Sequence, residues 1–157
     1  MGARTLGTIA SAGLVLAAAT AAAQTTDRRV LTLEGAKRIA AAAEAEARRQ
    51  GWAVCIAVVD ESGNLVVFVR LDDTQSASND IAIGKARTAA MFRRPTKAME
   101  DVVAGGRAVV MTFRDATLVQ GGLPLVSGGQ VVGGIGVSGV QSHQDEIVAK
   151  AGADVLT

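Results

Sequence analysis

The chain has 157 residues but only one cysteine, one histidine and two prolines, and it has no tyrosine. A single thiol, Cys55, cannot form an internal disulfide or a metal site built from several thiolates. With one histidine, a zinc site would have to rely on carboxylates, which argues against such a site. Cys55 lies inside the apolar run of residues 54–58, which predicts a buried small residue in a strand.

The sequence also lacks an excess of either charge. Sixteen Lys and Arg residues stand against 15 Asp and Glu residues, and basic residues are adjacent only in the pairs 28–29, 37–38, 48–49 and 93–94. This balance gives no electrostatic case for nucleic acid or for an anionic membrane surface as a partner. Aromatic residues make up 3% of the chain, whereas alanine, glycine and valine are abundant. This composition predicts thin helices that lie close on a sheet.

Residues 1–23 resemble a secretory signal peptide. Arg4 precedes an apolar run at 6–19, and three alanines at 21–23 precede Gln24. The alternative is a membrane anchor, but a span needs about 20 mainly apolar residues, and threonine and serine interrupt this run. We therefore expect cleavage after Ala23, a periplasmic or secreted protein without stable membrane insertion, and a single mature domain at 24–157 with zero net charge.

The mature part predicts one α+β domain. Apolar periodicity indicates helices at 33–50, about 80–92, 96–104 and 142–156, and strands at 53–59, 65–70, 123–126 and 130–138. Thr32 and Thr96 are expected N-caps, and Gly51 is an expected helix stop. Residues 107–114 fit either a strand or a helix. The order of elements predicts an α-β-α sandwich whose central antiparallel sheet is built from two β-hairpins, with helices flanking it.

Common catalytic and cofactor motifs are absent. The glycines at 133, 134 and 136 match neither a P-loop nor a Rossmann turn, and within a strand they predict close approach of another segment. A Ser-His-Asp triad would have to use His143, and no Gly-x-Ser-x-Gly elbow supports one. No Cys-x-x-Cys-His motif is present, which excludes covalent attachment of a c-type heme.

One face of the second predicted helix combines polar and apolar side chains. The residues at spacings of three and four are Ile81, Gly84, Lys85, Thr88 and Phe92. In one interpretation, Lys85 lies at the edge of the core and extends its ammonium to solvent. In the other, Lys85 points into a pocket, where it can pair with a carboxylate.

The junction between the last strand and the last helix, residues 138–145, is a second candidate region. Free backbone N–H groups at a helix start commonly bind anions. His143 in this first turn could ligate iron or act as a general base, or it is a solvated surface residue. Asp145 follows it, where the helix dipole favours an anion.

Several segments together resemble the GlcG/HbpS family and the C-terminal domain of PduO-type proteins. They are AVVD (57–60), GNL (63–65), RLD (70–72), IAIGKARTAA (81–90), RPT (94–96), GGLPL (121–125), VGGIGVSG (132–139) and QDE (144–146). Their order and spacing span nearly all of the mature part.

The resemblance implies an α-β-α sandwich that assembles into homo-oligomers and binds heme noncovalently, and for some members it implies a membrane sensor as partner. On this basis we expect Lys85 and Arg70 to pair with the heme propionates, and Thr88 and Met91 to line the pocket. His143 is the candidate axial ligand. Asp60 and Asp145 are expected to have structural roles.

Three functions are compatible with this pattern. The first is an exported heme-binding protein for capture, buffering or sensing, and the absence of a conventional catalytic constellation favours it over an enzyme. The second is an enzyme that accepts another small acidic ligand in the same pocket, with Lys85 or His143 as base. The third is an oligomeric adaptor for a membrane sensor.

Overall fold

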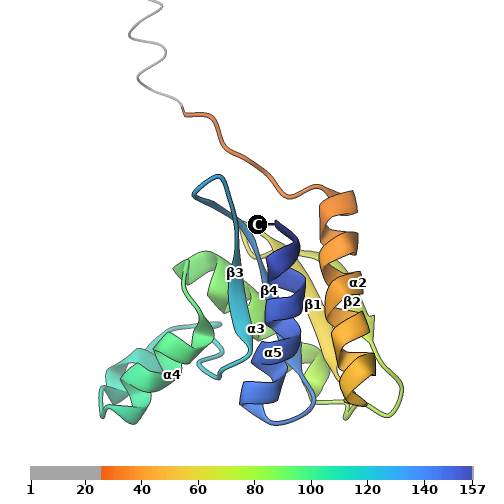
Figure 1. The fold of residues 1–157 in the computed structure, drawn as a ribbon. Helices are drawn as coiled ribbons and strands as arrows, with labels where there is room; N and C mark the ends of the chain where they lie inside the picture. Colours follow the sequence, from red (N-terminus) through yellow and green to blue (C-terminus); the bar gives the residue numbers. More distant parts are fainter. Residues whose placement is uncertain (1–25, 157) are drawn as a thin grey trace, which may run out of the picture.

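A computed structural model describes residues 26–156, so the predicted signal peptide and its cleavage site lie outside the described residues. The elements in chain order are α2 (Leu33–Gln50), β1 (Cys55–Asp60), β2 (Leu65–Arg70), α3 (Ser78–Phe92), α4 (Thr96–Ala104), the 3₁₀ helix η1 (Ala108–Thr112), β3 (Gly122–Ser127), β4 (Gln130–Ser138), α5 (Ser142–Ala153) and the 3₁₀ helix η2 (Asp154–Leu156). One antiparallel sheet has the order β2-β1-β4-β3. Helices α2 and α5 cover one face, α3 covers the other, and α4 projects from the side (Figure 1). The predicted sandwich is confirmed.

The strands pair as two hairpins that meet in the middle of the sheet. Cys55 of β1 lies opposite Arg70 of β2 on one side and opposite Ser138 of β4 on the other. Both predicted hairpins are confirmed, with turns at 61–64 and 128–129. The segment that fitted either strand or helix forms the 3₁₀ helix η1.

The predicted N-cap and helix stop are confirmed for α2, and the predicted bounds of α4 are confirmed, but its predicted N-cap is not. Thr32 Oγ1 accepts the N–H of Gly35 at 3.1 Å, and Gly51 ends the helix with a φ of 70°. The prediction for Thr96 is wrong, because Pro95 takes the N-cap position and its side chain makes no capping bond. The hydroxyl of Thr96 is fully buried and accepts the N–H of Gly122 at 2.9 Å. Its hydrogen-bond partner therefore lies in β3 and not in the first turn of α4.

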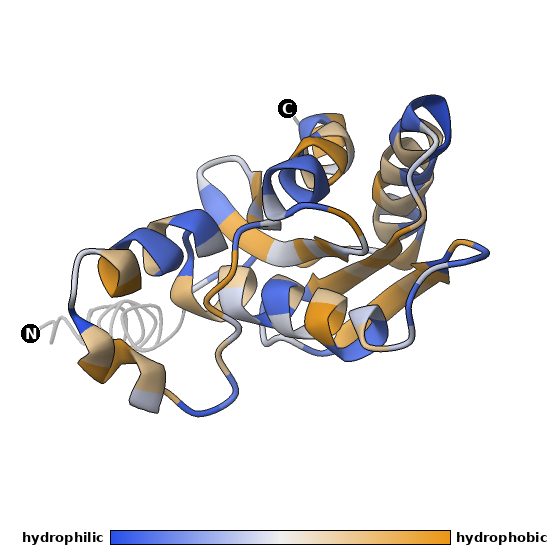
Figure 2. Cartoon of the chain, turned by 90° about the horizontal axis from the view of Figure 1, so that it is seen from below, coloured by the Kyte–Doolittle hydropathy of each residue, from blue (hydrophilic) through white to orange (hydrophobic). Residues whose placement is uncertain are grey.

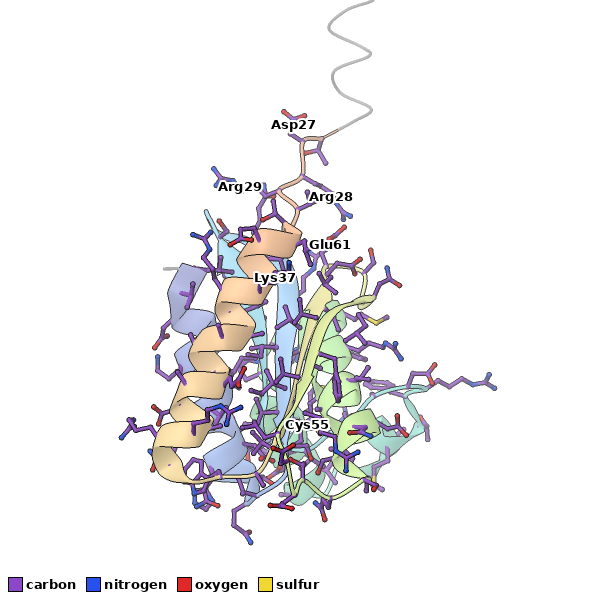
Figure 3. All side chains as sticks on the ribbon, turned by 90° about the vertical axis from the view of Figure 1, so that its right-hand side faces the viewer. Asp27, Arg28, Arg29, Lys37, Cys55 and Glu61 are labelled. Carbon is purple, nitrogen blue, oxygen red and sulfur yellow. The ribbon has the colours of Figure 1, made fainter. Side chains whose placement is uncertain are left out.

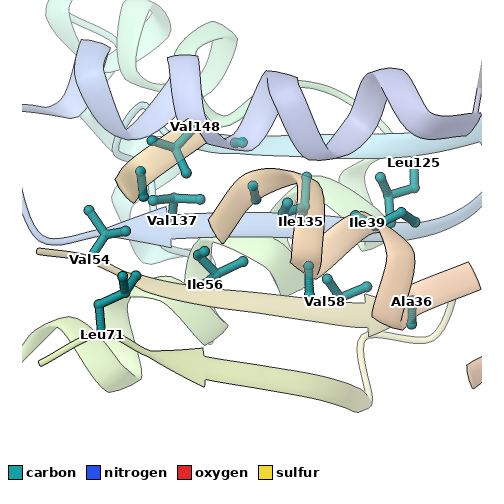
Figure 4. Close-up of a cluster of buried hydrophobic side chains, with 14 of the residues drawn as sticks. Ala36, Ile39, Val54, Ile56, Val58, Leu71, Leu125, Ile135, Val137 and Val148 are labelled. Carbon is teal, nitrogen blue, oxygen red and sulfur yellow. The ribbon is translucent and has the colours of Figure 1, made fainter. Parts of the chain in front are cut away.

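The larger core lies between the sheet and the pair α2 and α5 (Figure 4). Alternation along β1 directs Ile56 and Val58 to this face. Helix α2 contributes Ile39 and a row of alanines, which agrees with the expected thin helices. The fully enclosed members are Ala36, Ile39, Ala43, Ala47, Val54, Ile56, Val58, Leu125, Ile135, Val137, Val148 and Ala149.

On the opposite face, α3 packs directly on the backbone of β4. A Cβ atom at Gly136 would lie 2.2 Å from the carbonyl oxygen of Ala82 and 2.3 Å from the backbone nitrogen of Ala86. At Gly134 the same atom would lie 2.3 Å from the carbonyl oxygen of Ala86. The glycines therefore permit the close approach that their place in a strand pattern predicts.

Cys55 belongs to this second face, together with Ala57 and Val59. Its thiol is buried and donates to Asn79 Oδ1 at 3.1 Å. Burial raises the pKa of the Cys55 thiol, with a smaller opposing effect from Arg70, so the reactive thiolate is disfavoured. The predicted role of Cys55 as a buried strand residue is confirmed.

Hydropathy follows the layers, since the strands are mainly apolar and the helices carry polar outer faces (Figure 2). None of the helices within residues 26–156 has the length and apolar character to cross a membrane. Many apolar side chains are buried in the core, whereas several on η1 and on the segment after it are exposed.

Candidate functional site

Lys85 forms a buried ion pair. Its Nζ donates to Asp145 Oδ2 at 2.8 Å and to the carbonyl oxygen of Val137 at 2.9 Å. Both charged side chains are only 2% exposed. The structure therefore differs from both interpretations of Lys85, because the ammonium neither extends to solvent nor points into a pocket. A carboxylate from α5 holds it, and a heme propionate would have to displace this partner.

Asp145 connects its own helix, α5, to α3 and to the segment after β4. Its Oδ1 accepts the N–H of Val140 at 3.2 Å, while Oδ2 holds the ammonium from α3. Burial raises the pKa of the Asp145 carboxyl, and the hydrogen bond and charge of Lys85 oppose this effect in part. Gly121 has a φ of 119°, and a Cβ there would lie 2.9 Å from the ammonium. These contacts agree with the structural role expected of Asp145.

Thr88 holds the segment after η1 against α3. Its buried hydroxyl donates to the carbonyl oxygen of Gly84 and accepts the N–H of Thr117, both at 2.8 Å. The ring of Phe92 stacks on Phe113 with centroids 5.6 Å apart. These two contacts bring residues 114 and 115 beside the outer face of α3.

A cavity of about 310 Å³, which we call the α3 cavity, opens at this place. It lies between the C-terminal half of α3, the β1–β2 turn and the segment after η1. Its lining residues are Ser62, Gly63, Asn64, Arg87, Thr88, Met91, Phe92, Arg114 and Asp115. A neighbouring hollow of about 360 Å³ continues along α3 and shares Arg87 and Asp115. Of the predicted site residues, Thr88 and Met91 meet in the α3 cavity.

The α3 cavity combines two guanidinium groups with apolar and sulfur-containing side chains. Arg87 Nε donates to the carbonyl oxygen of Gly63 at 3.2 Å, which uses one of the five N–H donors of the guanidinium. Arg114 adds a second cation and Asp115 an anion, so the lining carries a net positive charge. Met91 and Phe92 supply the apolar surface. Such a lining fits a planar apolar ligand that carries carboxylates.

A second cavity, at the N-terminal segment, offers a different chemistry. Its volume is about 310 Å³, and Arg28, Arg29 and Arg93 stand with Asp27 and Glu61 in its lining. Figure 3 shows the labelled members of this group at one end of the molecule, with Cys55 toward the other end. Opposite charges share this lining, and it contains no aromatic or sulfur-containing side chain. It therefore gives no surface for a large apolar ligand.

The structure separates the two remaining predicted site residues from the α3 cavity. Arg70 is exposed at the end of β2 opposite to the β1–β2 turn, and its Nη2 donates to the carbonyl oxygen of Thr74 at 2.8 Å. His143 is exposed in the first turn of α5, on the other face of the sheet from α3. Its position agrees with the solvated interpretation.

Sequence reasoning missed both arginines of the α3 cavity. Arg87 precedes Met91 by four residues, so the two share a helix face, and this spacing was a usable signal. No comparable signal existed for Arg114, because it lies in the segment 107–114, which fitted either a strand or a helix. Within the described residues, no group of three or more His, Cys, Asp and Glu side chains is arranged to hold a metal ion.

The β1–β2 turn that borders the α3 cavity is organised by Asp60. Its Oδ1 accepts the N–H groups of Ser62 at 2.9 Å and Asn64 at 2.8 Å, and its Oδ2 accepts the Asn64 side chain at 3.0 Å. Burial acts to raise the pKa of Asp60, but the hydrogen bonds from Asn64, Ser62 and Gly63 outweigh it, so the pKa is lowered.

Asp60→Asn is expected to lower the free energy of unfolding by about 1–2 kcal/mol at neutral pH, because a charged acceptor is lost. A carboxylate whose folded pKa is depressed contributes stability above its unfolded pKa, about 3.9, and this stability is lost as the pH falls through the folded value. Urea unfolding at neutral pH and at about pH 3 measures this, with Glu61→Gln as the neighbouring control. An equal loss at both pH values would contradict the assignment.

Comparisons with known proteins agree with this fold. The family model described as "Haem degrading protein HbpS-like" matches residues 31–154. Among curated proteins, Protein GlcG of Escherichia coli K12 is 43% identical over 109 residues, which cover 69% of this chain and 81% of GlcG.

Two solved structures are also similar. The crystal structure of HbpS has a TM-score of 0.79 and 35% identity, and the match covers 86% of this chain and 96% of HbpS. The crystal structure of a PduOC–heme complex has a TM-score of 0.75 and 26% identity, covering 82% and 96% of the two chains. The sequence resemblance is therefore confirmed, and the chain belongs to the HbpS-like family.

Proposed function

We propose that this protein binds heme noncovalently in the α3 cavity. The observation that carries the proposal is the juxtaposition of Arg87 and Arg114 with Met91 and Phe92 in one lining. The family supports it, since its description names heme and since PduOC was crystallised with heme. Binding is required for heme degradation as well as for capture, buffering or sensing.

The lining fits each chemical part of heme. Arginine pairs with carboxylates through two parallel hydrogen bonds, so Arg87 and Arg114 would hold the propionates. The ring of Phe92 and the flexible thioether of Met91 would contact the macrocycle. When bound, heme supplies iron for redox chemistry and for binding of small ligands.

We further infer that the protein works outside the cytoplasm as a homo-oligomer. The pattern of residues 1–23 supports export. Exposed apolar side chains support self-association, since Val109, Met111 and Phe113 on and after η1 are 62%, 66% and 45% exposed. The resemblance adds a membrane sensor as a partner of the oligomer.

No observation favours the enzyme that would use Lys85 or His143 as base. The ammonium of Lys85 is held by Asp145 and Val137 inside the domain, away from the α3 cavity. His143 is exposed on the other side of the sheet. Neither residue faces a place where a small acid could be enclosed with the arginines.

A hemin titration followed in the Soret region tests the proposal. We expect saturable binding, about tenfold weaker in Arg87→Gln and in Arg114→Gln and about 100-fold weaker in the double variant, because each lost charged hydrogen bond contributes about 1.5 kcal/mol. Arg48→Gln on α2 is the control, since Arg48 pairs with Glu44 on the opposite face. A nonsaturating response, or equal affinities in all variants, would refute the proposed site.

A further inference from the structure

Met91 presents a thioether at the α3 cavity. It lies on α3, is 56% exposed and lines the α3 cavity together with Arg87. Its position depends on the adjacent turn, because a Cβ at Gly63 would lie 3.1 Å from Met91 Sδ and 2.9 Å from Arg87 Cγ. Gly63, with a φ of 85°, thus leaves the space that the sulfur and the arginine stem occupy.

Three other candidate iron ligands on or near this helix are engaged elsewhere. The thiol of Cys55 is buried and bonded to Asn79, and the hydroxyl of Thr88 both donates and accepts a hydrogen bond. The amine of Lys85 is held by Asp145. Guanidinium groups stay protonated and do not ligate metals.

The spacing on α3 suits a ligand that carries a metal at its centre and carboxylates at its edge. Arg87 and Met91 are four residues apart, so their side chains leave the same helix face about 6 Å apart along the axis. The guanidinium and the sulfur can therefore contact different parts of one bound molecule.

We propose that the thioether sulfur of Met91 is an axial ligand to the iron of heme bound in the α3 cavity. This inference rests on the proposed function. The sulfur donates a lone pair to the iron and releases no proton, because a thioether is neutral. Methionine ligation raises the reduction potential of heme iron relative to histidine ligation.

Absorption spectra and reduction potentials of the hemin complexes test this ligand. In the wild-type ferric complex we expect the sulfur-to-iron charge-transfer band, which Met91→Leu removes. Met91→His is expected to give a nitrogen-ligated spectrum and a lower reduction potential. Met111→Leu and Met111→His are the matched controls, since Met111 is also exposed but does not line the α3 cavity, and we expect them to keep the wild-type spectrum.

The outcomes separate this inference from the proposed function. Saturable hemin binding with an unchanged band and potential in both Met91 variants would overturn the ligand and leave heme binding in place. A wild-type protein that binds no hemin would overturn both. If Met111→Leu lost the band and Met91→Leu kept it, the ligand would be Met111 on η1, and the assignment of Met91 would be refuted.

Discussion

Replacing Lys85 with methionine is expected to lower the free energy of unfolding by about 3–5 kcal/mol. The substitution leaves the Asp145 carboxylate buried, with both side chains of the original pair only 2% exposed. An unpaired buried charge costs more than the pair itself contributes, so the single variants should be much less stable than a variant that lacks both charges. Urea unfolding of Lys85→Met, Asp145→Leu and the double variant measures this difference.

The exposed pair of Lys150 and Asp154 is the control for this prediction. Its side chains are 67% and 55% exposed, so Lys150→Met should change stability by less than about 1 kcal/mol. A loss of similar size in Lys85→Met would show that the buried pair is reached by solvent.

The same variant tests the heme role predicted for Lys85. In buffer where Lys85→Met remains folded, we expect its hemin affinity to equal that of the wild type, because Lys85 does not line the α3 cavity. A large loss of affinity in the folded variant would instead support propionate pairing by Lys85.

Gly136→Ala is expected to lower the free energy of unfolding by about 3 kcal/mol or more, at the upper end of what overpacking costs. The added methyl would lie 2.2 Å from the carbonyl oxygen of Ala82 and 2.3 Å from the backbone nitrogen of Ala86. These are main-chain atoms of α3, so the whole helix has to shift from the sheet. Thermal and urea unfolding measure the effect, and loss of the α3 cavity would appear as weaker hemin binding.

Gly129→Ala separates this clash from backbone strain. Gly129 has a φ of 76° in the β3–β4 turn, but a Cβ there would meet nothing within 4 Å. Only the left-handed conformation is then penalised, at about 1–2 kcal/mol. If the two variants lost equal stability, close packing of α3 on β4 would not explain the requirement for Gly136.

Local pattern predicted most of the secondary structure, since helix periodicity, strand alternation and turn residues act between near neighbours in the chain. The glycines of β4 also predicted the close approach of another segment, but their pattern did not identify that segment as α3. The prediction for Thr96 was wrong because capping propensity is local, whereas Gly122 reaches Thr96 from a distant strand.

The candidate site was only partly predictable. The family resemblance led us to expect Met91 and Thr88 in the lining of the pocket, and Arg87 lies on the same helix. Arg114 reaches the α3 cavity because the Thr88 hydroxyl and the stacked rings of Phe92 and Phe113 hold its segment against α3. No pattern within residues 107–114 encodes those contacts.

By itself, the sequence determined the order of helices and strands, the two hairpins, the alanine-rich helices and the family. The first three features depend on the spacing of residues that are close along the chain, and the family follows from the order of segments spread over the mature part. Only the tertiary structure decided that Lys85 pairs with Asp145, 60 residues away, and that three separate segments enclose the α3 cavity. Charge pairing and enclosure depend on distances in space, which folding sets through long-range packing.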